Sequence, residues 1–181
     1  MKNISEQKVS VLCDFSASMN GVILHGIFIA GFLGKELCLL SLTDKKNTNK
    51  SEIADRLGEL AQTIKSQAKQ MVVSTLVLKG CLARNVERLA DKYDSVILIM
   101  NKEQLSLKIK ALQESNIPCL FVDGKTTDLI SYKKVMLPVD FRKEMKETSL
   151  WASYLGRFNK AVVKVLAANE QKEGKIGRAH V

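Results

Sequence analysis

Residues 8–15 read KVSVLCDF, a short apolar run that ends on a carboxylate at Asp14. A long apolar stretch follows after the segment Ser-Ala-Ser at 16–18. This order is typical of a buried strand that delivers an aspartate to the edge of a sheet and is followed by a helix. Ser16 and Ser18 are of the residue type that caps a helix N-terminus, so we expect one of them to do so.

The pattern returns at residues 134–141, which read KVMLPVDF. Aligning Asp14 with Asp140 also pairs other residues: Val9 with Val135, Leu24 with Leu150, Phe32 with Phe158 and, after a one-residue gap, Leu37 with Val162. The chain therefore contains an internal repeat, and the other elements can be placed relative to the two aspartates.

Strand and helix patterns alternate along the chain. The expected strands lie at 36–42, 71–78, 95–100 and 117–122, and the expected helices at 19–34, 53–68, 82–93 and 105–112. Asn49, with Glu52 three residues later, is expected to cap the second helix. Strands that alternate with helices of this length imply right-handed crossovers, an α/β fold and a parallel sheet with helices on both faces.

A polar segment at 123–132, which includes Gly124, is interpreted as a linker. It separates a first domain, 1–122, from a second, 133–181, that contains only strand, helix (144–158) and strand (161–168). One such unit cannot bury both faces of its sheet, so we expect the second copy to be truncated.

Charge is unevenly distributed over the 181 residues, whose formal net charge is +9. Residues 132–181 hold 11 Lys or Arg against 5 Asp or Glu. These cations are interleaved with glutamates and form no continuous stripe, so we do not expect a nucleic-acid partner.

The sequence favours a cytoplasmic protein. The first eight residues, MKNISEQK, lack the apolar core of a secretory signal. The longest apolar stretch, 22–33, contains His25 and is too short to span a bilayer. The cysteines are widely separated and form no C-x-x-C pair, as expected of reduced thiols that are mostly buried: Cys13, Cys38, Cys81 and Cys119.

No catalytic constellation is found in the sequence. His25 lies inside an apolar helix and His180 in a polar tail, which gives neither a metal site nor a triad. His25 is therefore interpreted as a hydrogen-bonded core residue. No Walker A sequence is present, and we expect the protein not to be an enzyme.

Four segments together resemble the universal stress protein family. They are VMLPVDF (135–141), LKGCLA (78–83), DSVILIM (94–100) and IPCLFV (117–122), which resemble the end of the family's first strand, its Gly-x-x-A turn, its fourth strand and its closing strand. The resemblance covers 8–122 as a whole unit and 133–168 as a partial one. It implies a Rossmann-like five-stranded parallel sheet of order 3-2-1-4-5, often dimeric or in tandem.

In such a sheet, ligands bind beyond the carboxyl ends of the strands where the strand order reverses. The resemblance implies that Asp14 would lie near the adenine and ribose of a bound ATP. The candidate cofactor-binding residues are Asp14, Gly80, Met100 and Asn101. Alternatively, Asp14 is a strand-end carboxylate that caps the first helix, and Asp140 has the same two interpretations.

The family's phosphate cradle is missing from the first unit. Residues 100–107 read MNKEQLSL, and no glycine lies between Gly80 and Gly124. Glycines let backbone amides approach a phosphate, and Glu103 would place a negative charge there instead. We therefore expect no cofactor in this unit, with ATP as the alternative.

The helix at 19–34 is apolar on nearly every side. We expect the second unit or another copy of the chain to cover part of it, unless a loop such as 44–51 does so. The predicted function is that of a non-enzymatic stress-response regulator that acts through dimerisation or protein interaction. The alternative is an adenine-nucleotide sensor that uses Asp14, Gly80 and Asn101.

Overall fold

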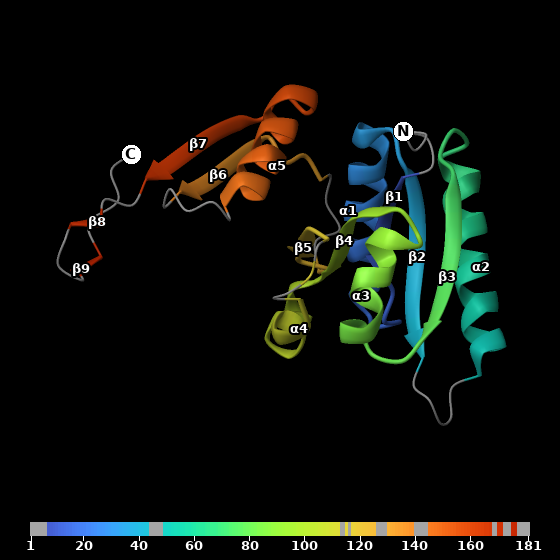
Figure 1. Ribbon diagram of the computed structural model, residues 1–181. Coiled ribbons are helices and arrows are strands. Elements are labelled where there is room, and N and C mark those ends of the chain that lie inside the picture. Colours follow the sequence, from blue (N-terminus) through green and yellow to red (C-terminus); the bar gives the residue numbers. More distant parts are fainter. Residues whose placement is uncertain are drawn as a thin grey trace. The chain divides into compact units, whose positions relative to one another are not determined.

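The computed structural model describes residues 7–43, 49–112, 115, 117–125, 130–139, 145–167, 170–171 and 175–176. The chain forms two compact units, Met1–Ile130 and Ser131–Val181 (Figure 1). Asp140 and Phe141, on which the sequence alignment of the repeat depends, lie outside the described residues.

The first unit is a five-stranded parallel sheet of order β3-β2-β1-β4-β5, which confirms the predicted fold. Its strands are β1 (Lys8–Leu12), β2 (Glu36–Thr43), β3 (Val73–Lys79), β4 (Ser95–Asn101) and β5 (Cys119–Val122). Its helices are α1 (Met19–Leu33), α2 (Lys50–Gln67), α3 (Leu82–Asp91), the short 3-10 helix η2 (Lys102–Gln104) and α4 (Leu105–Leu112). Asn49 caps α2 as predicted, because its side chain accepts a hydrogen bond from the Ser51 amide.

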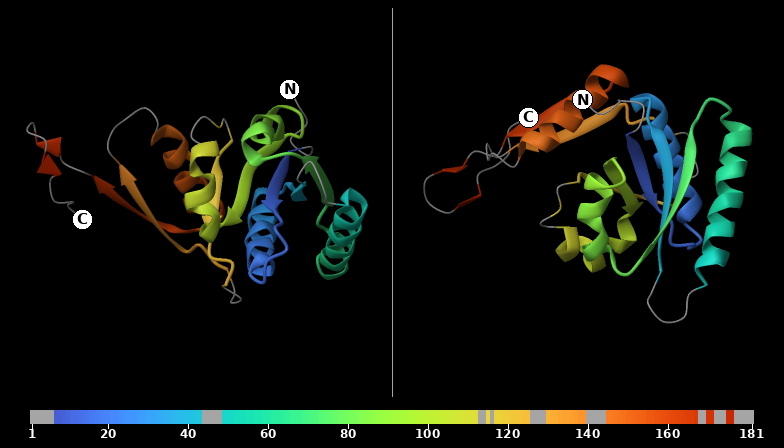
Figure 2. Two further views of the ribbon diagram at one scale, coloured as in Figure 1. Left: turned by 90° about the horizontal axis from the view of Figure 1, so that it is seen from below. Right: turned by 45° about the vertical axis from the view of Figure 1, so that its right-hand side comes forward.

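Helices cover both faces of this sheet, with α1 and α2 on one side and α3 on the other (Figure 2, left). Alternate residues of each strand point to opposite faces. Val11 faces α1, since a Cβ added to Gly26 would come within 2.2 Å of its Cγ2 atom. The next residue, Leu12, belongs to the core cluster that includes Leu82 and Leu89 of α3. The β-branched and leucine-rich strands are therefore buried on both sides.

The two ends of α1 are built differently. Gly34 adopts φ 62° after the last turn, and its amide donates to the carbonyls of Ala30 and Gly31. At the other end Ser18 is the N-cap residue, but its side chain makes no capping bond among the described residues. The prediction that Ser16 or Ser18 caps the helix through its hydroxyl is thus wrong. The Ser18 hydroxyl instead accepts a hydrogen bond from the side-chain amide of Asn101.

The second unit begins with β6 (Lys134–Val139), α5 (Met145–Phe158) and β7 (Val162–Ala167), and β6 and β7 pair in parallel. Lys134 is opposite Val162 just as Lys8 is opposite Glu36. Val163 therefore takes the position of Leu37, and the one-residue gap in the sequence alignment is wrong. A short antiparallel pair, β8 (Glu170–Gln171) and β9 (Lys175–Ile176), follows where the sequence indicated no element. None of the described helices has the length and apolar character needed to cross a membrane.

Candidate functional site

Asp14 lies just beyond the carboxyl end of β1 and is exposed. Its Oδ1 atom accepts hydrogen bonds from the backbone amide of Ser16 (3.0 Å) and from its hydroxyl (2.7 Å). Its Oδ2 atom accepts one from the side-chain amide of Gln104. The carboxylate thus holds the turn after β1 and joins it to the segment after β4, and none of these three bonds goes to the first turn of α1.

Asn101 ends β4 and is only 4% exposed. Its Nδ2 atom donates to the Ser18 hydroxyl at 2.7 Å, and its Oδ1 atom accepts from the Glu103 amide at 3.1 Å. The Ser18 hydroxyl lies 3.2 Å from that of Ser16. One hydrogen-bonded network therefore connects Asp14 with Asn101 across the ends of β1 and β4.

The other two candidate binding residues lie differently. The Met100 side chain is 0% exposed in the core cluster beneath α3, so it is not available to a ligand. Gly80 adopts φ 100° between β3 and α3, and its amide donates to the Thr43 carbonyl at 2.8 Å. Because β2 and β1 separate β3 from β4 in the sheet, Gly80 lies beyond the network that joins Asp14 and Asn101.

Two ion pairs occupy the region after β4 and β5. The Lys102 ammonium lies 2.5 Å from the Asp123 carboxylate, and the Lys125 ammonium 3.0 Å from that of Glu103. The hydrogen bond from Lys102 is the main cause that lowers the pKa of Asp123, and the bond to Glu103 raises the pKa of Lys125. Such exposed pairs add little stability. They do leave both lysines engaged with carboxylates.

Gly124 brings the chain after β5 against the start of α1. A Cβ at this position would lie 2.4 Å from the backbone oxygen of Ser18 and 3.0 Å from a methyl group of Val22. Residues 123–125, which the sequence assigned to the linker, are therefore bonded and packed onto the first unit.

The pocket at this edge of the sheet is small. Its volume is about 250 Å³, and Asp14, Phe15, Ile53, Gln104 and Lys108 are among its lining residues. Phe15 adopts φ 57°, and the Arg56 guanidinium lies 4.0 Å from the centre of its ring. Sites for small molecules usually measure about 300–1,000 Å³. The pocket is below that range.

Comparison with known proteins identifies the fold. No protein-family model matches the chain, and no curated protein matches its sequence. A universal stress protein from Archaeoglobus fulgidus DSM 4304 has a similar structure, with a TM-score of 0.67 and 16% identity over 95% of this chain and 70% of its own. The chain has the universal stress protein fold.

Two further structures share the universal stress protein fold of this chain. A protein of unknown function from Pseudomonas aeruginosa PAO1 matches with a TM-score of 0.60 and 19% identity, over 92% of this chain and 62% of its own. An Archaeoglobus fulgidus universal stress protein in complex with dAMP matches with a TM-score of 0.52 and 14% identity, over 67% of this chain and 100% of its own.

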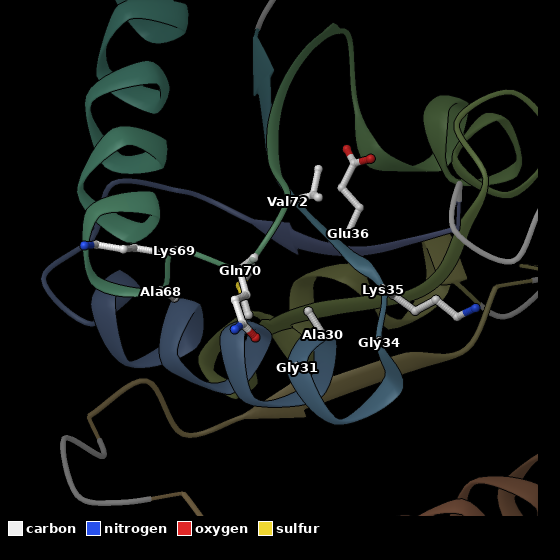
Figure 3. Close-up of a pocket in the computed structure, with 10 residues that line it drawn as sticks. Ala30, Gly31, Gly34, Lys35, Glu36, Ala68, Lys69, Gln70 and Val72 are labelled. Atoms are coloured by element: carbon white, nitrogen blue, oxygen red, sulfur yellow. The ribbon is translucent and has the colours of Figure 1, made fainter.

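A larger pocket in the universal stress protein fold of this chain lies at the opposite, amino-terminal ends of the strands (Figure 3). It measures about 570 Å³ and lies between the C-terminal ends of α1 and α2, near the starts of β2 and β3. Figure 3 shows the Lys35 and Lys69 side chains pointing away from it in opposite directions. None of the four candidate residues lines it.

Burial makes three of the four thiols, those of Cys13, Cys38 and Cys119, poor nucleophiles because it raises their pKa values. All four cysteines are free, and Cys13 and Cys38 are buried. Burial raises the pKa of Cys13 to about 12 and that of Cys119 to about 11. Cys81 is exposed at the start of α3. Among the described residues, no three His, Cys, Asp or Glu side chains are grouped so that they could hold a metal ion.

His25 is buried in α1, as the sequence predicted. Burial lowers its pKa, while a hydrogen bond to the Asp123 backbone and the charge of Asp123 act in the opposite direction with smaller effect.

Four residues of the network and of the two ion pairs were not among the predicted site residues: Ser18, Gln104, Asp123 and Lys125. In the sequence they are ordinary polar residues, and only the strand order brings them together.

We expect acid to destabilise the protein through His25. Its pKa is lowered on folding, so the unfolded chain binds the proton more readily. The free energy of unfolding should therefore decrease as the pH falls below about 6.5, the pKa of an unperturbed histidine. Urea denaturation at pH 7.5 and 5.5 would measure this, with His25→Gln as the control that cannot titrate. Equal pH dependence in the two proteins would contradict the assignment.

Proposed function

We propose that this chain is a member of the universal stress protein family and acts as a non-enzymatic stress-response regulator. It works through dimerisation or protein interaction, and its first unit binds no nucleotide. The observation that supports this most strongly is the hydrogen-bonded network that connects Asp14 with Asn101 at the ends of β1 and β4. There Asp14 and Asn101 already have partners in Gln104, Ser16 and Ser18.

The chemistry of the loop after β4 supports the absence of nucleotide binding. A phosphate is best bound by free backbone amides at a glycine-rich turn. Here the Glu103 amide donates to Asn101, and the Glu103 side chain brings a carboxylate to the same turn. A triphosphate would have to displace Glu103 from Lys125 and Asp123 from Lys102. Both released carboxylates would then repel it.

The environments of the Cys13 thiol and the His25 imidazole also support the proposal that the protein is not an enzyme. A catalytic acid, base or nucleophile is usually found in a cleft with a pKa tuned to its task. The pKa of Cys13 is raised to about 12, which keeps this thiol protonated. His25 is buried in α1 rather than placed in the small pocket beside Asp14.

Features of the first unit support dimerisation. Among the described strands β5 pairs only with β4, which leaves one edge of β5 open for pairing with another chain. The neighbouring α4 exposes apolar side chains, with Leu107 82% and Ile109 46% exposed. The partner is proposed to be a second copy or a tandem unit. The four free cysteines suit the proposed cytoplasmic location.

The alternative is an adenine-nucleotide sensor. It is favoured by one observation, that a universal stress protein from Archaeoglobus fulgidus with this fold forms a complex with dAMP. In this chain the ligand would enter the pocket beside Asp14 and would have to displace the Gln104 side chain.

Calorimetric titration of the full chain with ATP, and then with AMP, tests the proposal. We expect no binding heat from either nucleotide, because the crevice is closed and carries Glu103. Micromolar binding that Asp14→Ala abolishes would favour the sensor instead. Gln104→Ala serves as the matched variant, since it opens the crevice without removing the carboxylate. Binding that appears only in Gln104→Ala would mean that Gln104 is what blocks the site.

A further inference from the structure

Two cations lie at the small pocket beside Asp14. The half-buried Lys108 of α4 lines this pocket. The Arg56 guanidinium of α2 lies 4.0 Å from the centre of the Phe15 ring, and Phe15 lines the pocket as well. Among the residues that the structure describes, neither cation forms an ion pair with a carboxylate, in contrast to the lysines that follow β4 and β5. A half-buried charge without a counter-charge favours an anionic ligand.

The stacking of Arg56 on the Phe15 ring does not use its hydrogen-bond donors. A cation–π contact involves the flat face of a guanidinium, whereas the N–H donors lie along its edge. Ile53 of α2 lines the pocket, and Arg56 follows it by three residues, so both side chains lie on the same side of this helix. The edge of Arg56 is thus suited to bind a carboxylate through two parallel hydrogen bonds.

Aliphatic side chains and the Phe15 ring give the pocket an apolar part. Leu12, Leu42 and Ile53 line it together with Phe15. A cavity of about 150 Å³ with such a lining holds benzene. This pocket measures about 250 Å³. It therefore has room for a single ring or a short alkyl chain that carries a carboxylate, but it is smaller than the usual site for a larger ligand.

Asp14 also lines the pocket, but its negative charge is already compensated by hydrogen-bond donors. Its Oδ1 atom accepts from the amide and the hydroxyl of Ser16, and its Oδ2 atom accepts from the side chain of Gln104. Donors directed at a carboxylate stabilise its charge. With Lys108 and Arg56 opposed to this one carboxylate, positive charge is in excess around the pocket.

We propose that the pocket beside Asp14 binds a small monocarboxylate whose apolar part is about the size of one ring. The carboxylate contacts Lys108 and the edge of Arg56, and the apolar part packs on Phe15 and Ile53. This inference goes beyond the proposed function, because it gives the regulator a small-molecule ligand. An amine fits less well, since the two cations would repel it. A nucleotide fits less well because the pocket is too small.

The test uses the full chain, the carboxylates benzoate and butyrate, and the corresponding amides benzamide and butyramide. Each amide has nearly the shape of its carboxylate but carries no charge. NMR titration of the isotope-labelled chain measures the binding and identifies the residues that the ligand contacts. We expect each carboxylate to bind at least about tenfold more tightly than its amide, because hydrogen bonds between charged groups are stronger than neutral ones. Added salt should decrease this difference.

Variants of the charged residues connect the binding to this pocket. Lys108→Met keeps the apolar stem and removes the charge, so it should weaken the binding of benzoate at least about tenfold and leave that of benzamide unchanged. Lys110→Met is the matched control, because Lys110 is an exposed residue of the same helix and lies outside the described pocket lining. Asp14→Asn should strengthen the binding of benzoate, because it removes a negative charge from the pocket. Circular dichroism of each variant verifies that the fold is retained.

Three results would overturn the inference. The first is equal binding, or no binding, of the carboxylates and their amides. The second is an equal effect of Lys108→Met and Lys110→Met on the binding of benzoate. The third is displacement of benzoate by an equal concentration of inorganic phosphate, which would mean that the apolar part of the ligand is not recognised. Binding of ATP or AMP would instead refute the proposed lack of nucleotide binding, so the two proposals fail by different results.

Discussion

Truncation of Leu89 to alanine is expected to lower the free energy of unfolding by about 3–5 kcal/mol, within the range for fully buried leucines. Leu89 of α3 is 0% exposed and packs with Leu40, Leu98 and Met100 beneath the helix. The truncation leaves a cavity that rigid strands on the opposite side cannot fill. A domain of this size is stable by only about 5–15 kcal/mol, so the effect should be large.

Urea denaturation followed by circular dichroism measures this effect, and Leu107→Ala is its control. Both residues are helical leucines, so the difference in helix propensity is the same in the two variants. Leu107 is 82% exposed and its truncation should change the stability by less than about 0.5 kcal/mol. Similar losses in both variants would mean that α3 is not held by burial of its apolar stripe.

The substitution Gly26→Ala is expected to destabilise the first unit by about 1–3 kcal/mol. The added Cβ would lie 2.2 Å from Cγ2 of Val11 and 3.2 Å from Cδ1 of Leu37. Val11 and Leu37 are 0% exposed in central strands, so neither can move aside without disturbing the core. This crowding should outweigh the gain of up to about 1 kcal/mol that alanine usually brings to a helix interior.

Gly31→Ala on the same helix provides the control and should have the opposite sign. Its added Cβ would meet only the Met71 methyl group, at 3.8 Å, which is ordinary contact. Without crowding, the better helix propensity of alanine should raise the stability by roughly 0.5–1 kcal/mol. Thermal and urea unfolding of the two variants measure both changes in the free energy of unfolding. Stabilisation by Gly26→Ala would contradict the close packing of α1 on β1.

Much of the fold could be predicted from the sequence because its signals are local. The apolar run before Asp14 predicted β1, and the helical spacing of apolar residues between Ile53 and Ala68 predicted α2. Of the six residues expected on the apolar face, Ile53, Leu57, Ala61 and Ile64 are buried, whereas Leu60 and Ala68 are half-buried. The strand order came from the resemblance to the universal stress proteins and is confirmed. The errors in the predicted boundaries of strands and helices are small. They arise because the ends of these elements depend on hydrogen bonds rather than on periodicity.

Less of the candidate site could be predicted. Asp14 and Asn101 were correctly expected at one edge of the sheet, but the partners that join them, Ser18 and Gln104, were not. Met100 was a candidate because the fourth strand was expected to end there, next to the crevice between the ends of the first and fourth strands. Because side chains alternate along a strand, the side chain of Met100 faces the opposite side from that of Asn101 and is buried in the core.

The sequence by itself determined the elements, the repeat and the lack of glycine between Gly80 and Gly124, because periodicity, capping residues and glycine content are properties of neighbouring residues. Only the tertiary structure decided what the segment after β4 contacts. Lys102 and Glu103 follow β4, whereas Asp123 and Lys125 follow β5, and they form ion pairs because these strands are adjacent and parallel. The same holds for the second unit: the sequence patterns of β6 and β7 are those of buried strands, whereas the structure shows Met136 and Val162 to be 66% and 61% exposed.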